Sequence, residues 1–182
     1  MMNRRQFLKD LAWKSTAVAI GLAIPGYAFG NSDRKILEGD SDKVLLARMI
    51  LGEATGCSTT EKLYVGFTPL NRLKHGKPYR NDNTLKKVLL HKNQFSCFND
   101  STKKTAQNLK RIISPTGKEW YESLTLAEVL LRGEWDTHNF GQTHFYKKDL
   151  VEKLEQGKLK INPKKLKPIN SENFKHQFYR ET

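Results

Sequence analysis

Acidic residues are scarce in this chain of 182 residues: 19 Asp and Glu stand against 32 Lys and Arg, which gives a net charge of +13. The imbalance is not confined to the start of the chain, because the residues after position 30 still hold 28 basic and 18 acidic groups. A basic surface favours a polyanion such as nucleic acid, anionic lipid or an acidic cell-wall polymer. Zinc-finger spacing and an aromatic-plus-basic sheet motif are both missing, so we expect no nucleic-acid partner.

Cysteine is nearly absent, with Cys57 and Cys97 as the two examples. The histidines are His75, His91, His138, His144 and His176. They show neither the clustering of a zinc site nor a His-Glu-x-x-His motif, so we predict no metal and no cofactor. A cysteine nucleophile with a histidine base is an alternative, although no flanking sequence resembles a cysteine peptidase.

Long apolar runs are missing too, and the one near the N-terminus has the features of an export signal. Arg4 and Arg5 are followed by Phe, Leu and Lys at the spacing of a twin-arginine signal, and an apolar segment at 17–24 comes next. Small residues at 28 and 30 permit cleavage before Asn31. That apolar segment is too short to span a bilayer with margin. We predict a signal peptide at 1–30 and export to the periplasm, cell wall or exterior, with an uncleaved membrane anchor as the alternative.

The remainder reads as one mainly helical domain. Residues 31–41 are predicted to be a polar linker, and residues 42–182 a single domain with a basic C-terminal segment. The helices are expected at 42–55, 58–76, 85–91, 102–113 and 114–133, the second starting in a Ser58–Glu61 capping box. A short β-like or loop element is expected near 141–146, and the aromatic segment 174–179 is expected to pack back on the domain.

The helix predicted at 42–55 is apolar on nearly every side, with Arg48 as the strongly polar member of its body. A helix of this kind is usually surrounded by the rest of its domain. Glu53 continues its most apolar stripe, which is formed by Leu46, Met49 and Ile50. A carboxyl group placed there loses hydration, which favours its protonated form and makes it a candidate general acid. The alternative is a helix-end glutamate that turns to solvent or pairs with Arg48 or Lys62.

Several motifs in order along the chain resemble those of the SleB-type cell wall hydrolases, the family of spore-cortex-lytic enzymes. The matching segments are Leu46–Ala54, Val65–Leu73, Gln94–Cys97, Leu130–Gly133 with Thr143–Tyr146, and His176–Tyr179. Together they extend over about residues 44 to 180. The resemblance implies a lysozyme-like, mainly helical fold and lytic transglycosylase-type cleavage of peptidoglycan between muramic acid and glucosamine.

The resemblance also implies roles for individual residues. Glu53, in the Gly-Glu-Ala motif, would be the catalytic acid. The candidates for holding sugar hydroxyls and amides are Asn71, Gln94, Ser96, Thr143, His144 and Tyr146. Ordinary loop hydrogen bonds or core packing are the alternative for each of them. A glycoside hydrolase needs a second carboxylate, whereas a transglycosylase does not, because the sugar's own 6-hydroxyl closes the ring. Asp100, Glu134 and Asp136 keep hydrolysis open.

The chain departs from the family at one position, where Cys57 replaces a glutamate found in many members four residues after the catalytic one. In an exported protein the two cysteines favour a disulfide, so we predict a Cys57–Cys97 bond that contributes about 3 to 4 kcal/mol. The expected partner is peptidoglycan, with contact to an anionic cell-wall surface, and the chain is expected to be a monomer. An N-acetylmuramoyl-L-alanine amidase and a non-enzymatic wall-binding module are the alternative functions.

Overall fold

The computed structural model describes residues 31–75, 83–91, 94–99, 103–134, 139–155, 166–169 and 172–181. The predicted signal peptide at 1–30 and the candidate acids Asp100 and Asp136 lie outside these residues. Among the described helices, none is both long and apolar enough to cross a membrane.

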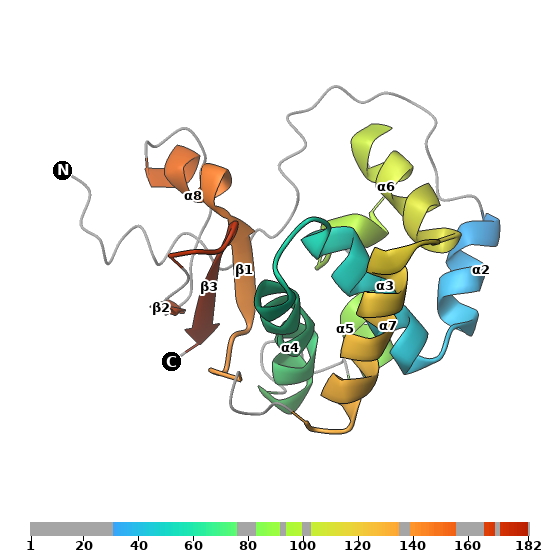
Figure 1. Ribbon diagram of the computed structural model, residues 1–182, viewed down its shortest axis with the longest axis horizontal. Helices are drawn as coiled ribbons and strands as arrows, with labels where there is room; N and C mark the ends of the chain where they lie inside the picture. Colours follow the sequence, from blue (N-terminus) through green and yellow to red (C-terminus); the bar gives the residue numbers. More distant parts are fainter. Residues whose placement is uncertain are drawn as a thin grey trace.

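The central element is helix α3 (Asp42–Ala54), whose side chains from Leu45 to Leu51 are all buried. The sequence allows Ser41 or Asp40 to cap its N-terminus, and in the structure Ser41 does so by accepting a hydrogen bond from the Val44 amide. The surrounding elements are α4 (Thr59–His75), α5 (Leu85–Leu90), η1 (Ser96–Phe98), α6 (Lys103–Ile113) and α7 (Lys118–Leu131), and each contacts α3. Figure 1 shows these helices gathered together, with a small sheet on the far side of α4.

The sheet has three antiparallel strands, β1 (His144–Lys147), β2 (Leu166–Ile169) and β3 (His176–Glu181), in the order β1-β3-β2. Phe178 of β3 lies opposite Phe145 and Ile169, and it is fully buried. Its ring packs edge-on against Tyr64 of α4 at 5.2 Å, which attaches the sheet to the helices. Helix α8 (Lys148–Glu155) follows β1 directly.

The structure confirms a mainly α fold with a small β element, and the packing of the aromatic C-terminal segment. Three predictions need correction. The segment 31–41, predicted as a linker, contains helix α2 (Asn31–Gly39), which places Leu37 in the core. Helix α7 starts at Lys118 after Gly117, not at Ser114-Pro115. The β element is a full sheet of three strands, and its strand β2 lies in the lysine-rich stretch, where the sequence predicted no strand.

Candidate active site

Glu53 lies in the last turn of α3, where its side chain is half-buried. Its carboxylate accepts a hydrogen bond from the Cys97 amide at 2.7 Å and from the Ser96 hydroxyl at 3.0 and 3.1 Å to its two oxygens. Both donors belong to η1. They are also the last two residues of the predicted Gln94–Cys97 motif, which contains the Gln-Phe-Ser sequence. The carboxylate is therefore held in place by a neighbouring loop while one side of it stays accessible.

Arg48 and Lys62, the two basic residues that the sequence offered as partners for Glu53, form ion pairs with other residues. Arg48 forms an ion pair with Asp40 at 2.7 Å and donates to the Ile113 carbonyl at 2.8 Å. Lys62 pairs with Glu122 at 2.8 Å. Both of these basic side chains are buried and fully engaged, so the pairing of Glu53 with either is ruled out.

Gly52 explains how η1 comes so close to Glu53. A Cβ atom built on Gly52 would lie 2.4 Å from the Cys97 Cβ, a distance that real Cβ atoms essentially never show, and 3.0 Å from its Sγ. The absence of a side chain at position 52 therefore lets Cys97 pack directly on α3. This contact places the Cys97 amide and the Ser96 hydroxyl beside the next residue of the helix, Glu53.

Arg72, near the end of α4, joins two of the predicted site segments. Its guanidinium donates to the Thr143 carbonyl at 2.7 Å and to the Gln94 side chain at 3.0 Å, and it lies 4.9 Å from the centre of the Phe95 ring. The side chain is buried. Arg72 lies within the Val65–Leu73 motif, but nothing local to α4 shows that residues 94 and 143 meet there, so the sequence indicates no role for it.

The remaining predicted site residues separate into accessible and buried groups. Ser96 is exposed and Gln94 is half-buried. Asn71, Thr143, His144 and Tyr146 are all buried. Asn71 donates to the Asn139 side chain and the Gln142 carbonyl, each at 2.9 Å, and the Thr143 hydroxyl lies 2.9 Å from His144 Nδ1. Contacts from the four buried residues to sugar remain predictions. Their burial favours a role in supporting the loops around Glu53.

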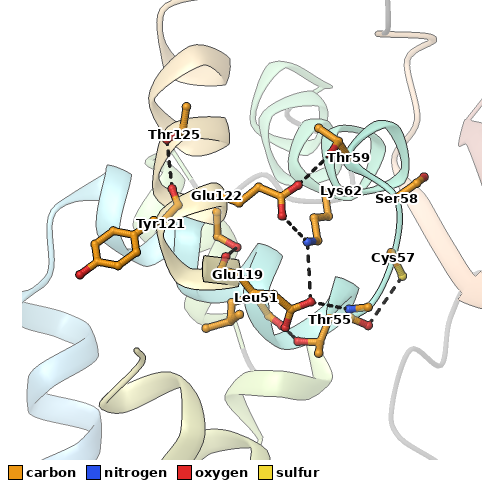
Figure 2. Close-up of polar contacts among 12 residues, drawn as sticks. Leu51, Thr55, Cys57, Ser58, Thr59, Lys62, Glu119, Tyr121, Glu122 and Thr125 are labelled. Carbon is orange, nitrogen blue, oxygen red and sulfur yellow. Dashed lines mark hydrogen bonds and ion pairs between the residues drawn. The ribbon is translucent and has the colours of Figure 1, made fainter. Parts of the chain in front are cut away.

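The loop between α3 and α4 is fixed to α7 by a cluster of polar contacts (Figure 2). Lys62 lies between Glu122 at 2.8 Å and Glu119 at 3.8 Å, and its side chain is 4% exposed. Glu119 also accepts from the Gly56 amide at 2.8 Å, while Glu122 accepts from the Thr59 hydroxyl at 2.8 Å. The cluster therefore anchors the segment that follows Glu53.

This cluster predicts a pH-dependent contribution to stability. The hydrogen bond from Lys62 holds the pKa of Glu122 below its usual value of 4.5, so the contribution is complete above pH 4.5 and is lost as the pH falls through the lower folded-state value. Glu122→Gln leaves the buried Lys62 ammonium poorly paired and should lower the free energy of unfolding by about 1 to 3 kcal/mol at neutral pH. Urea unfolding at several pH values measures this.

The difference between Glu122→Gln and the parent should shrink as the solution is acidified below pH 4.5, because the parent carboxylate then becomes neutral as well. Glu128→Gln serves as the control, since its ion pairs with Lys43 and Arg132 are exposed and should contribute little. A stability deficit for Glu122→Gln that is the same at every pH would contradict the assigned pairing.

The predicted Cys57–Cys97 disulfide is not formed: both cysteines are free thiols. They lie in different surroundings, since Cys97 packs on Gly52 beside Glu53, whereas Cys57 lies beside Glu61 at the start of α4. Burial, together with the nearby Glu61 carboxylate, raises the pKa of the Cys57 thiol to about 11. Because a thiol with that pKa is a poor nucleophile at neutral pH, the cysteine-peptidase alternative loses support.

The side chain of Glu61 does not make the helix-capping contact that the Ser58–Glu61 capping box predicts. The first half of the capping box is present, because the Glu61 amide donates to the Ser58 hydroxyl at 3.2 Å. The carboxylate, however, accepts from His176 of β3, through Nδ1 at 2.7 Å and through the backbone amide at 2.9 Å. Sequence reasoning missed this buried pair because the two residues are 115 positions apart.

Comparison with known proteins gives one match. The family model described as Cell Wall Hydrolase matches residues 56–175, which is more than half of the chain. The matched span contains the predicted sugar-binding residues but begins three positions after Glu53. No curated protein and no solved structure matches the chain.

Proposed function

The chain belongs to the cell wall hydrolase family, and from that premise we propose that it cleaves the glycan strand of peptidoglycan by a lytic transglycosylase mechanism. Membership in the family makes peptidoglycan the substrate and hydrolysis of the wall the general activity. The glycan bond, the transglycosylase chemistry and the SleB-type relationship are the finer proposals.

The observation that carries the proposal is the position of the Glu53 carboxylate. It is half-buried, is fixed by donors from η1, and keeps an accessible side. In the described part of the chain, no other carboxylate shares a hydrogen bond with it. Glu134, one candidate for a second acid, is exposed and lies 3.9 Å from Arg132. The fixed and accessible Glu53 carboxylate supports a reaction in which this group transfers the proton.

The proposed reaction uses that carboxyl group twice. In its protonated form Glu53 donates the proton to the glycosidic oxygen as the bond to the muramic acid C1 breaks and positive charge develops on the ring. The resulting carboxylate then takes the proton from the muramic acid 6-hydroxyl, whose oxygen bonds to C1. The products are a glucosamine 4-hydroxyl end and a 1,6-anhydromuramic end, and Glu53 regains its proton.

The excess of 28 basic over 18 acidic groups after position 30 supports the docking of this enzyme on an anionic wall. The basic C-terminal region and the exposed face of α6 would provide that contact. We also propose that the first thirty residues direct export by the twin-arginine route, so that the enzyme acts in the periplasm or cell wall as a monomer.

Mass spectrometry of the fragments released from purified sacculi tests the proposal. Anhydromuramic ends are the expected product. Reducing muramic ends would replace the transglycosylase mechanism with hydrolysis, and free stem peptides would assign the chain as an amidase. Release of no fragments by folded protein would make it a wall-binding module and contradict the proposed enzyme activity.

A further inference from the structure

Three residues of different ligand types meet at the junction between α4 and the sheet. Cys57, Glu61 and His176 each offer one ligand atom, and these atoms all lie within 4.8 Å of one another. Cys57 precedes α4, Glu61 is in its first turn, and His176 starts β3. The cluster is separate from the Glu53 carboxylate, whose partners come from η1.

The surroundings of His176 are unusual for a structural histidine. Its side chain is 2% exposed, and its Nε2 atom has no hydrogen-bond partner among the described residues. Glu61 is equally buried, and its single Oε1 atom accepts from both the His176 ring and the His176 amide. A buried carboxylate that shares its site with an imidazole and a thiol is costly unless the charge is balanced.

A divalent cation would balance that charge. Thiolate sulfur, imidazole nitrogen and carboxylate oxygen are together the ligand set that zinc prefers. With bond lengths of about 2.0 to 2.3 Å, the ligand atoms of a tetrahedral zinc site lie about 3.3 to 3.8 Å apart. Glu61 Oε1 and His176 Nδ1 lie 2.7 Å apart, so zinc would replace the proton between them and the two side chains would separate by about 0.6 Å. The Cys57 side chain, which is half-buried and at the edge of the site, would rotate toward them.

We propose that Cys57, Glu61 and His176 bind one zinc ion, with the fourth position filled by water on the Cys57 side. Glu61 and His176 are too buried to admit a peptide carbonyl, so a metal there is poorly placed for amidase chemistry. It would instead join the loop that follows Glu53 to the first residue of β3, at a place where Lys175 already donates to the Gly56 carbonyl at 2.7 Å.

Cobalt titration tests the proposal, because Co²⁺ replaces zinc at such sites and its bond to a thiolate absorbs in the near ultraviolet. The full chain, treated with chelator and then titrated with Co²⁺, should bind one equivalent and develop that band, which added Zn²⁺ removes. Zinc should also raise the thermal unfolding midpoint by several degrees. Cys57→Ser should abolish both effects, and His176→Gln should weaken binding at least tenfold.

Cys97→Ala is the matched control: it removes the other thiol, retains the Cβ that contacts Gly52, and should titrate like the parent. Glu53→Gln should also bind cobalt normally, so loss of activity and loss of metal are separable. The proposal is overturned if folded parent protein shows no thiolate–cobalt band, or if the band survives in Cys57→Ser. Circular dichroism confirms that each variant is folded before the titration.

Discussion

Replacing Glu53 with glutamine is expected to reduce the rate of peptidoglycan cleavage by about 100- to 10,000-fold, the range that general acid–base catalysis supplies. The amide has nearly the same shape as the carboxyl group and can still accept from the Cys97 amide and the Ser96 hydroxyl. It has no acidic proton for the glycosidic oxygen. Clearing of a suspension of purified sacculi, with equal amounts of folded protein, measures the rate.

Glu134→Gln is the isosteric control for this experiment. Glu134 is exposed at the end of α7, so its replacement should leave both stability and rate close to those of the parent. If Glu134→Gln instead lowered the rate as far as Glu53→Gln, a second carboxylate would be required and the reaction would be a hydrolysis.

The second large effect is expected for Gly52→Ala, which does not alter any polar group. The added Cβ would lie 2.4 Å from the Cys97 Cβ, so η1 must move away from α3. We expect a loss of about 1 to 3 kcal/mol in the free energy of unfolding from overpacking. We also expect a fall of about 100-fold in rate, because misplacement by about 1 Å near the reacting groups can have that effect. Urea unfolding and the sacculus assay measure the two quantities.

A double-mutant cycle with Cys97→Gly isolates this contact, because that substitution removes the atoms that clash. Gly52→Ala should cost distinctly less stability in the Cys97→Gly background than in the parent. Gly66→Ala is the control, since its Cβ would meet Leu130 and Ile50 in the core, away from η1. It should lower stability without lowering the rate of the folded enzyme. Equal costs in both backgrounds would show that Gly52 does not position η1.

Periodicity predicted the parts of the structure that depend on local sequence. The apolar run from Val44 to Leu51 gave α3 its correct bounds within one residue, and Thr84 caps α5 as its residue type suggests. The sequence does not predict helix α2, because its polar composition resembles that of a linker, although Leu37 is buried and fixes the helix to the core. The sequence does not predict strand β2, because its four residues, Leu166–Ile169, include a lysine and a proline and show no run of β-branched or aromatic side chains.

In the candidate site, too, the residues could be predicted from local sequence, whereas the contacts between distant segments could not. Glu53 and the Gln-Phe-Ser segment could be named from the chain alone, but their contact depends on Gly52, whose role is visible only when η1 is placed against it. The local pattern at Ser58–Glu61 predicts a helix-capping role for Glu61, whereas in the structure its carboxylate accepts from His176, which no local pattern indicates. The predicted disulfide is wrong because an exported chain with two cysteines favours pairing in general, but the sequence does not show that Cys57 and Cys97 pack against different partners.

The central claim is that the Glu53 carboxyl group transfers the proton that breaks the glycan strand. Incubating sacculi with Glu53→Gln, pelleting them, and measuring both the bound protein and the soluble muropeptides in the same tube tests it most directly. The account predicts that as much variant as parent protein is found in the pellet, while fragments with anhydromuramic ends are missing from the supernatant. Release of those fragments by Glu53→Gln at the rate of the parent would contradict it.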